Sequence, residues 1–241
     1  MEKHYIPGTE FEIYADRGMF SFGIDAILLS EFAKMKKNKV LVDIGTGTGI
    51  IGLRCLYKYN LKKVYGIELQ KEVYDMFEKS IELNNLSDRV IGINKNLNDC
   101  YIDFENDSID YIVSNPPYKK KNSGIINDKD NFSISRHEIA MVLEDIFKFA
   151  KLKLKDNGAL YIVHRPERIV DLINFGRKYN LEPKSMRSIM SKKNTQPKMV
   201  LIKFIKNAGE FFSWEKPFIV YEENGEYTEE VVDTYYGKNK R

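Results

Sequence analysis

The sequence of 241 residues is poor in cysteine and has no long apolar run. Its two cysteines, Cys55 and Cys100, lie in apolar-patterned segments, so we expect buried, reduced thiols and no disulfide. No apolar stretch approaches the ~20 residues that a membrane-spanning helix needs. Residues 1–18 carry charges and no apolar block, which argues against a secretion signal. We therefore expect a cytoplasmic protein without a membrane segment.

Net charge is also low, since the whole chain carries only +3. The charge is unevenly spread: residues 208–241 hold eight acids and four bases, and residues 1–207 hold 27 acids and 34 bases. The excess of bases suits a polyanionic partner, although ordinary solvated lysines account for it equally well. We divide the chain into a domain of residues 1–207 and an acidic arm of residues 208–241 that packs on it and faces away from nucleic acid.

Short β-branched apolar runs alternate with helical patterns along most of the chain. Near-continuous apolar strands separated by helices predict a mostly parallel sheet that is covered on both faces. The expected fold class is a doubly wound, Rossmann-like α/β domain, in which ligands bind at the carboxyl ends of the strands. The expected strands are residues 40–44, 63–68, 90–94, 110–115, 159–164 and 199–205, and the expected helices are 49–60, 71–85, 136–155 and 166–180.

A glycine-rich loop follows the first of these strands, in the segment VLVDIGTGTGIIGL of residues 40–53. Gly45, Gly47 and Gly49 allow positive φ and a close approach of the backbone to a ligand. Residues 47–52 also satisfy the G-x-G-x-x-G spacing of dinucleotide sites. The carboxylate of Asp43 disfavours a pyrophosphate at this place. It suits S-adenosylmethionine, whose methionine end carries an ammonium and a sulfonium group.

The D-x-G-x-G-x-G pattern, followed by Glu68 at the end of the second strand, resembles the class I methyltransferases. The resemblance implies that Glu68 binds the ribose hydroxyls of S-adenosylmethionine. It also implies that a residue after the third strand contacts the adenine amine. By spacing this residue is Asn96, with Asp99 as the alternative, and an exposed polar loop accounts for the segment equally well. Asp25, in the cofactor-lining segment 1–35, is implied at the methionine end, although a helix N-cap also explains it.

The fourth strand ends in Asn115-Pro116-Pro117-Tyr118. An N-P-P-Y motif at this place resembles the amino-methyltransferases, which act on adenine N6, cytosine N4 or a glutamine amide. Such a nitrogen is a weak nucleophile, so the site must stabilise the positive charge that grows on it. We expect the Asn115 side-chain oxygen and the Pro116 carbonyl to accept its two N–H bonds, with Asn115 also bordering the cofactor. Tyr118 offers a face on which a flipped base stacks.

Basic residues near the expected site favour RNA as the substrate, although a solvated charge run is the ordinary explanation of such lysines. Three of them directly follow Tyr118, and residues 183–198 carry five bases and no acid. This stretch is expected to form a second basic surface. The candidate RNA contacts are Lys119, Lys120, Arg136, His164, Arg165, Lys192 and Lys193.

The motifs FGIDAILLSEF, DIGTGTGIIGL, NPPY, RHE and HRPER, in this order, together resemble the bacterial tRNA(Val) adenine-N6 methyltransferase family. The resemblance implies methylation of the adenine 3′ of the anticodon, at position 37. It implies S-adenosylmethionine as the cofactor, tRNA as the partner and no metal. The alternative is N5 methylation of a glutamine in a protein. Both a monomer and a dimer remain open.

Overall fold

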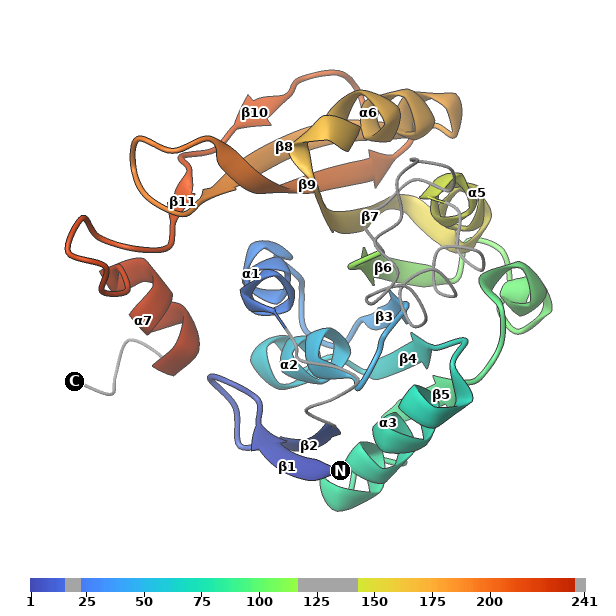
Figure 1. Ribbon diagram of the computed structural model, residues 1–241. Helices are drawn as coiled ribbons and strands as arrows, with labels where there is room; N and C mark the ends of the chain where they lie inside the picture. The colour runs from blue at the N-terminus through green and yellow to red at the C-terminus, as the bar shows by residue number, and fades with distance from the viewer. Residues whose placement is uncertain (16–22, 117–142, 237–241) are drawn as a thin grey trace, which may run out of the picture.

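The computed structural model describes residues 1–15, 23–116 and 143–236 (Figure 1). Within these residues one long mixed sheet runs through the molecule. Its strands lie in the order β5 (Val90–Ile93), β4 (Lys63–Ile67), β3 (Val40–Ile44), β6 (Ile109–Ser114), β7 (Leu154–His164), β9 (Pro197–Lys206) and β8 (Leu181–Met190). Neighbours pair in parallel except at β9, which runs antiparallel to both β7 and β8. The fold class expected from the sequence is thereby confirmed.

Helices cover both faces of this sheet (Figure 1). Successive strand residues point to opposite faces, so Leu41 packs in one apolar cluster and Val42 in the other. The first cluster includes α1 (Ile24–Phe32), α2 (Ile50–Tyr59) and α3 (Lys71–Leu83). The second includes the 3₁₀ helix η1 (Leu97–Ile102), α5 (Leu143–Lys153) and α6 (Ile169–Lys178), which follows the short 3₁₀ helix η2 (Pro166–Arg168).

The expected elements agree with this arrangement except for three differences. β7 begins at Leu154, earlier than expected, and α5 begins at Leu143, so the rest of the expected helix 136–155 lies outside the described residues. β8 was not expected, because its segment contains the basic residues Lys184 and Arg187. Its buried Met186 and Ile189 nevertheless pack in the two apolar clusters on opposite faces of the sheet.

An N-terminal hairpin of β1 (Glu2–Tyr5) and β2 (Glu12–Ala15) packs on α3. The backbone N–H of Glu12 donates to Asn84 Oδ1 at 3.0 Å, and Asn84 Nδ2 donates back to the Glu12 carbonyl at 2.7 Å. Tyr14 N–H donates to Ser80 Oγ at 2.9 Å. Between these contacts Ile13 is fully buried. Side-chain groups of α3 thus satisfy backbone donors of β2 that the two-stranded hairpin leaves open.

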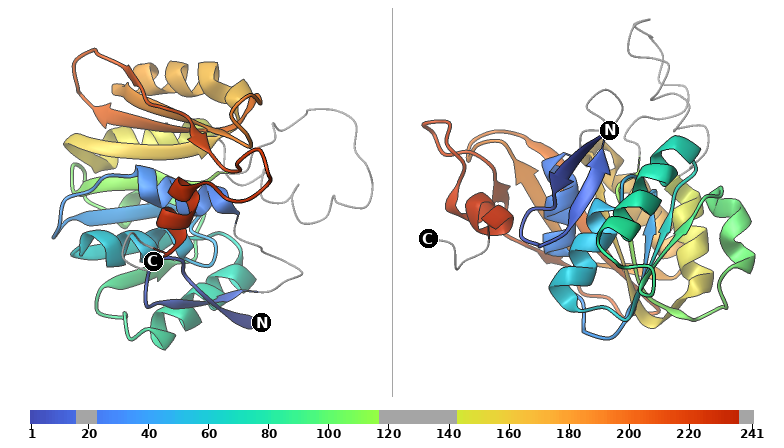
Figure 2. Two further views of the ribbon diagram at one scale, coloured as in Figure 1. Left: turned by 90° about the vertical axis from the view of Figure 1, so that its left-hand side faces the viewer. Right: turned by 90° about the horizontal axis from the view of Figure 1, so that it is seen from below.

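The C-terminal arm extends the sheet at its β8 edge, where β10 (Ser213–Trp214) and β11 (Phe218–Ile219) pair in parallel with β8. The arm ends in α7 (Glu229–Tyr236), which packs against β11 and α1 at the side of the molecule (Figure 2). An unpaired sheet edge invites pairing with other chains, so the arm protects β8. None of the helices in the described part of the chain has the length and apolar composition needed to span a bilayer.

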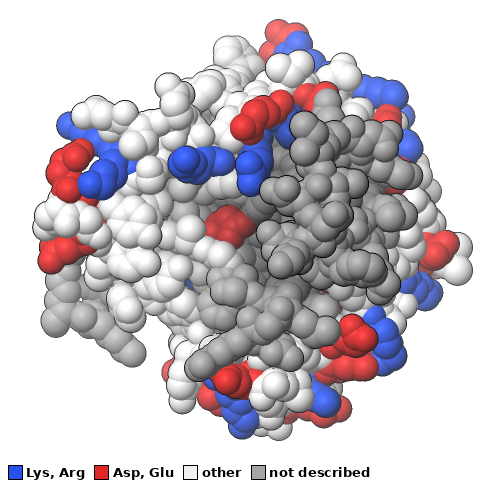
Figure 3. All heavy atoms as spheres, in the orientation of Figure 1, with Lys and Arg blue, Asp and Glu red and all other residues white. Residues whose placement is uncertain are grey.

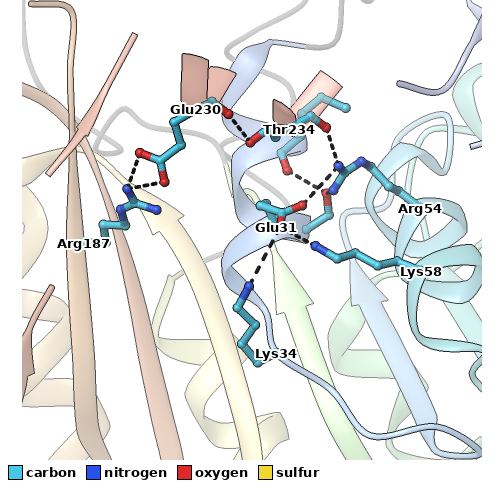
Figure 4. Close-up of polar contacts among 9 residues, drawn as sticks. Glu31, Lys34, Arg54, Lys58, Arg187, Glu230 and Thr234 are labelled. Carbon is cyan, nitrogen blue, oxygen red and sulfur yellow. Dashed lines mark hydrogen bonds and ion pairs between the residues drawn. The ribbon is translucent and has the colours of Figure 1, made fainter. Parts of the chain in front are cut away.

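Polar contacts fasten the arm to the body around a cavity of about 630 Å³ (Figure 4). The buried Arg54 guanidinium donates to the carbonyl oxygens of Pro7 at 3.0 Å and Thr234 at 2.7 Å, and to Ser30 Oγ at 2.9 Å. It also pairs with Glu31 at 3.2 Å. One side chain of α2 therefore connects the N-terminal hairpin region, α1 and α7.

Candidate active site

The glycine loop between β3 and α2 adopts a backbone that other residues rarely tolerate. Gly45, Gly47 and Gly49 have φ of 70°, 60° and 93°, as the sequence predicted. The Phe77 ring packs against the loop, and a Cβ at Gly49 would lie 2.4 Å from it. Gly66 faces the same ring, with a clash of 2.4 Å for an added Cβ. The tight packing of the Phe77 ring thus adds a steric requirement for glycine to the requirement set by positive φ.

Asp43, the last polar residue of β3, lies fully buried below this loop. Its Oδ2 accepts hydrogen bonds from Thr46 Oγ1 at 2.8 Å and from the Gly52 N–H at 2.9 Å. Its Oδ1 has no hydrogen-bond partner among the described residues. Burial raises the pKa of Asp43 to about 7, against the opposing effect of the two hydrogen bonds. A buried acceptor with open capacity fits a ligand that brings a positive charge.

Gly52 is a functional position that the sequence reasoning missed. A Cβ there would lie 3.0 Å from Val64 Cγ1 and 3.2 Å from Asp43 Oδ2. The absence of a side chain lets the first turn of α2 approach β3 closely enough to hydrogen-bond the carboxylate. The available signal was the fourth glycine of the segment, one helical turn after Gly49.

Glu68 stands just after β4 with 6% of its surface exposed. Its Oε2 accepts from the Gly47 N–H at 3.0 Å, and its Oε1 accepts from the Gln70 N–H at 2.8 Å. Each carboxylate oxygen has two acceptor sites, so each keeps one for a further donor. Asn94, after β5, donates from Nδ2 to the Glu68 carbonyl at 2.8 Å and holds the two strand ends together.

Asn115 and Asp25, 90 positions apart, meet beside the glycine loop. Asn115 Nδ2 donates to Asp25 Oδ2 at 3.1 Å. Asp25 is not a helix N-cap, because Gly23 holds that position and makes no side-chain cap bond. Pro116 is buried directly after Asn115. Pro117 and Tyr118, with the expected stacking ring, lie outside the described residues.

Asn96 precedes η1 as its N-cap. Its Oδ1 accepts a hydrogen bond from the Asn98 N–H at 2.9 Å. This local contact is what an Asx turn requires, so it explains the side chain without a ligand. The adenine contact assigned to Asn96, and the alternative at Asp99, therefore stay predictions.

The residues that were expected to contact RNA differ in their solvent exposure. His164 is 1% exposed, and its Nδ1 accepts from the Arg165 N–H at 2.8 Å. Burial lowers the pKa of His164 to about 4. A neutral ring without accessible surface does not contact RNA, so that prediction is wrong. Arg165 and Lys193 are exposed. Lys119, Lys120 and Arg136 lie outside the described residues.

The second basic surface is largely occupied by the arm. Lys184 donates to the Gly209 carbonyl at 2.8 Å, and Lys192 donates to the Glu223 carbonyl at 2.9 Å. Arg187 makes a two-pronged contact with the Glu230 carboxylate (Figure 4). The expectation of a continuous RNA surface over residues 183–198 is corrected accordingly, because three of its cations bind this chain.

Figure 3 views the face on which the parallel strands end. Acidic side chains lie in a hollow at its centre, and lysine and arginine side chains lie along the rim above. Among the described residues no three side chains of His, Cys, Asp or Glu are grouped so as to hold a metal ion. The described site therefore offers buried carboxylates, a carboxamide and backbone N–H groups as its chemistry.

Comparison with known protein families shows to which family this chain belongs. A family model described as the methyltransferase small domain matches residues 10–172. This chain belongs to the methyltransferase small domain family. The matched range contains the glycine loop, Glu68 and Asn115.

Relatives of this methyltransferase are similar over most of its length. A protein of Flavobacterium psychrophilum is 24% identical over 82% of this chain and 84% of its own, and one of Flavobacterium johnsoniae is 26% identical over 82% and 83%. Both are named tRNA1(Val) (adenine(37)-N6)-methyltransferase. They match the family to which the sequence motifs pointed.

Solved structures share the fold at lower identity. A predicted O-methyltransferase of Agrobacterium tumefaciens aligns with a TM-score of 0.72 and 18% identity, over 89% of this chain and 96% of that one. A geranyl diphosphate C-methyltransferase of Streptomyces coelicolor, solved with S-adenosyl-L-homocysteine, aligns with a TM-score of 0.57 and 13% identity, over 76% and 80%. At these identities the similarity concerns the fold alone.

Proposed function

We propose that this methyltransferase transfers a methyl group from S-adenosylmethionine to the exocyclic N6 of adenine in tRNA. The single observation that carries the proposal is the Asn115 carboxamide, held by Asp25 at the carboxyl end of β6 beside the glycine loop. The names of the two Flavobacterium relatives support tRNA(Val) as the substrate and adenine 37, next to the anticodon, as the target.

The residues around the loop fit S-adenosylmethionine, which supplies an electrophilic methyl group on a sulfonium. The open acceptor of Asp43 suits the positive methionine end, and Asp25 adds a second carboxylate on that side. The two remaining acceptor sites of Glu68 suit the pair of ribose hydroxyls. Gly45 and Gly47 have no side chains, which allows the backbone to approach a ligand closely at these two positions.

The hydrogen bond to Asp25 supports a catalytic role for Asn115. Because Nδ2 donates to a carboxylate, the carboxamide is oriented, and in the proposed mechanism Oδ1 accepts a hydrogen bond from the substrate amine. The Pro116 carbonyl accepts the second N–H. Both dipoles then point at a nitrogen that becomes positive as its bond to the methyl group forms, which stabilises the transition state more than the ground state. The methylated nitrogen afterwards loses one proton to water.

Nucleoside mass spectrometry tests the proposal. Purified protein, S-adenosylmethionine and a tRNA(Val) transcript should yield N6-methyladenosine, and a transcript with guanine at position 37 should yield none. Equal methylation of both transcripts would refute the position. Methylation of a protein glutamine, with no product on RNA, would refute the substrate class.

A further inference from the structure

Three tyrosines of the arm stack one after another, and we call Tyr221, Tyr227 and Tyr235 the tyrosine track. The rings of Tyr221 and Tyr227 lie 5.2 Å apart at an angle of 17°, and those of Tyr227 and Tyr235 lie 6.5 Å apart at 16°. A β-bridge between Tyr221 and Tyr227 holds the first pair. Three nearly parallel rings therefore follow one another along the arm.

Core packing explains only the Tyr235 end of this stack, where the ring packs against the first apolar cluster. Tyr227 is 55% exposed and Tyr221 is 37% exposed. Aromatic pairs in the core are buried and meet edge to face, as Phe147 and Phe204 do at 88°. The Tyr227 ring instead lies between Tyr221 and Tyr235, and the outer face of the exposed Tyr221 ring is where an unpaired nucleic-acid base extends the stack.

One end of the track lies at the edge of the sheet that carries the site. The Val220 N–H donates to the Met190 carbonyl at 2.9 Å, and the Tyr221 N–H donates to the Ser191 carbonyl at 2.8 Å. The track therefore begins where β8 ends. β8 runs in the same direction as β6, because β9 between β7 and β8 is antiparallel to both. The carboxyl end of β6, with Asn115, faces the same side.

The other end of the track approaches the site itself. Tyr235 belongs to α7, which packs against α1, the helix that carries Asp25. Burial is the first cause that raises the pKa of Tyr235, and repulsion from Tyr227 and Asp25 adds to it. Tyr235 thus lies within electrostatic reach of the carboxylate that orients Asn115. The track leads from the outer rim of the molecule toward the candidate active site.

The charged side chains near the tyrosine track differ in their effect on RNA phosphates. The turn beside it carries the exposed Glu222, Glu223 and Glu226, which repel phosphates. Across the connection from β8 to β9, Lys193 and Lys198 are exposed and attract them. A single RNA strand fits this pattern when its backbone follows the lysines and its bases turn toward the tyrosines.

We propose that the tyrosine track is a platform on which unpaired bases of the substrate RNA loop stack while the target adenine occupies the Asn115 site. The inference rests on the proposed function and adds to it the surface that holds the neighbouring bases. It departs from the expectation that the acidic arm faces away from nucleic acid. A stacking platform is neutral, so it contributes affinity without releasing counterions. The lysines, in contrast, contribute through counterion release.

The test measures the Kd of an anticodon stem-loop RNA by fluorescence anisotropy over a range of salt concentrations. Tyr227→Ala should raise the Kd by roughly 5- to 100-fold with an unchanged salt slope, because the aromatic ring on which Tyr221 stacks is lost. Tyr227→Phe should bind as the wild type does. Lys193→Ala should reduce the salt slope instead. Trp214→Ala is the matched control, since Trp214 is 63% exposed on the same arm but lies on β10, and its Kd should not change.

Two further variants separate stacking from folding. Tyr227→Leu keeps apolar bulk without an aromatic face, so it should lose RNA affinity as Tyr227→Ala does. Binding restored by Tyr227→Leu, or an equal loss in Trp214→Ala, would overturn the platform. If the wild type methylates the RNA while Tyr227→Ala binds it equally well, only the platform is refuted. A wild type that methylates no RNA refutes the proposed function itself.

Discussion

The Asn115 carboxamide is bound to the Asp25 carboxylate across 3.1 Å, from the end of a central strand to the first turn of the N-terminal helix. This contact connects two segments that are 90 positions apart. It fixes which end of the carboxamide faces a substrate, because the amide nitrogen is already committed. The orientation of the acceptor therefore depends on a residue outside the N-P-P-Y motif.

Removing Asp25 should slow the reaction through this orientation. Asp25→Ala is expected to lower kcat by roughly 10- to 100-fold with little change in the KM for RNA, because the acceptor loses its alignment. Asp25→Asn keeps an acceptor oxygen and should recover much of the rate. Steady-state kinetics and a calorimetric titration with S-adenosylmethionine decide between roles. A weakened cofactor Kd is expected from the loss of a carboxylate at the methionine end, whereas an unchanged kcat would contradict the orienting role of Asp25.

Removing the acceptor itself should have the larger effect. Asn115→Ala is expected to lower kcat by roughly 10²- to 10³-fold, the loss typical of one preorganised dipole at a developing charge. S-adenosylmethionine binding should survive, as a calorimetric titration would show. Turnover equal to that of the wild type would contradict the role of Asn115.

Glu68 should matter for cofactor affinity. Glu68→Ala removes two charged acceptor sites, and hydrogen bonds to charged groups are worth about 1.5–3 kcal/mol each. We expect the Kd for S-adenosylmethionine to rise by at least tenfold. Glu72→Ala, at the exposed start of α3, is the control and should not change the Kd. An unaltered titration for Glu68→Ala would rule out the ribose contact.

The glycine loop gives a stability prediction. Gly49→Ala places a Cβ 2.4 Å from the Phe77 ring at a φ of 93°, so the free energy of unfolding should fall by about 1–3 kcal/mol. Gly209→Ala is the matched control, because nothing lies within 4 Å of its added Cβ. Urea titrations measure both. Equal midpoints for the two variants would show that Phe77 moves aside freely.

Asp43 gives a dependence of stability on pH. The folded chain keeps a proton on Asp43 up to about pH 7, whereas the unfolded chain releases it near the ordinary pKa of 3.8. The folded state therefore binds more protons in this window, and the free energy of unfolding falls as pH rises through it. Asp43→Asn removes this contribution. Its stability relative to the wild type should be greater at about pH 8 than at about pH 5, and parallel profiles would contradict the raised pKa.

Local patterns in the sequence predicted much of the fold and part of the site. Strand and helix periods gave the parallel sheet, and spacing gave the loop glycines, whose positive φ is confirmed. Position along the chain did not reveal that Lys184, Arg187 and Lys192 bind the arm, because these pairings are non-local. The sequence also did not show that the His164 side chain is buried. Side chains alternate between the two faces of a strand, and the face of the last residue depends on the register of the strand.

The contacts of the Arg54 guanidinium affect how the newly made chain folds. Its partners include the carbonyl of Thr234, which leaves the ribosome long after Arg54 itself. Domains fold as units while they are synthesised, but this buried cation lacks one of its acceptors until α7 has been synthesised. The helix that positions Asp25 is therefore secured late, and a chain that terminates before α7 should be a poor enzyme even though its whole catalytic motif has been translated.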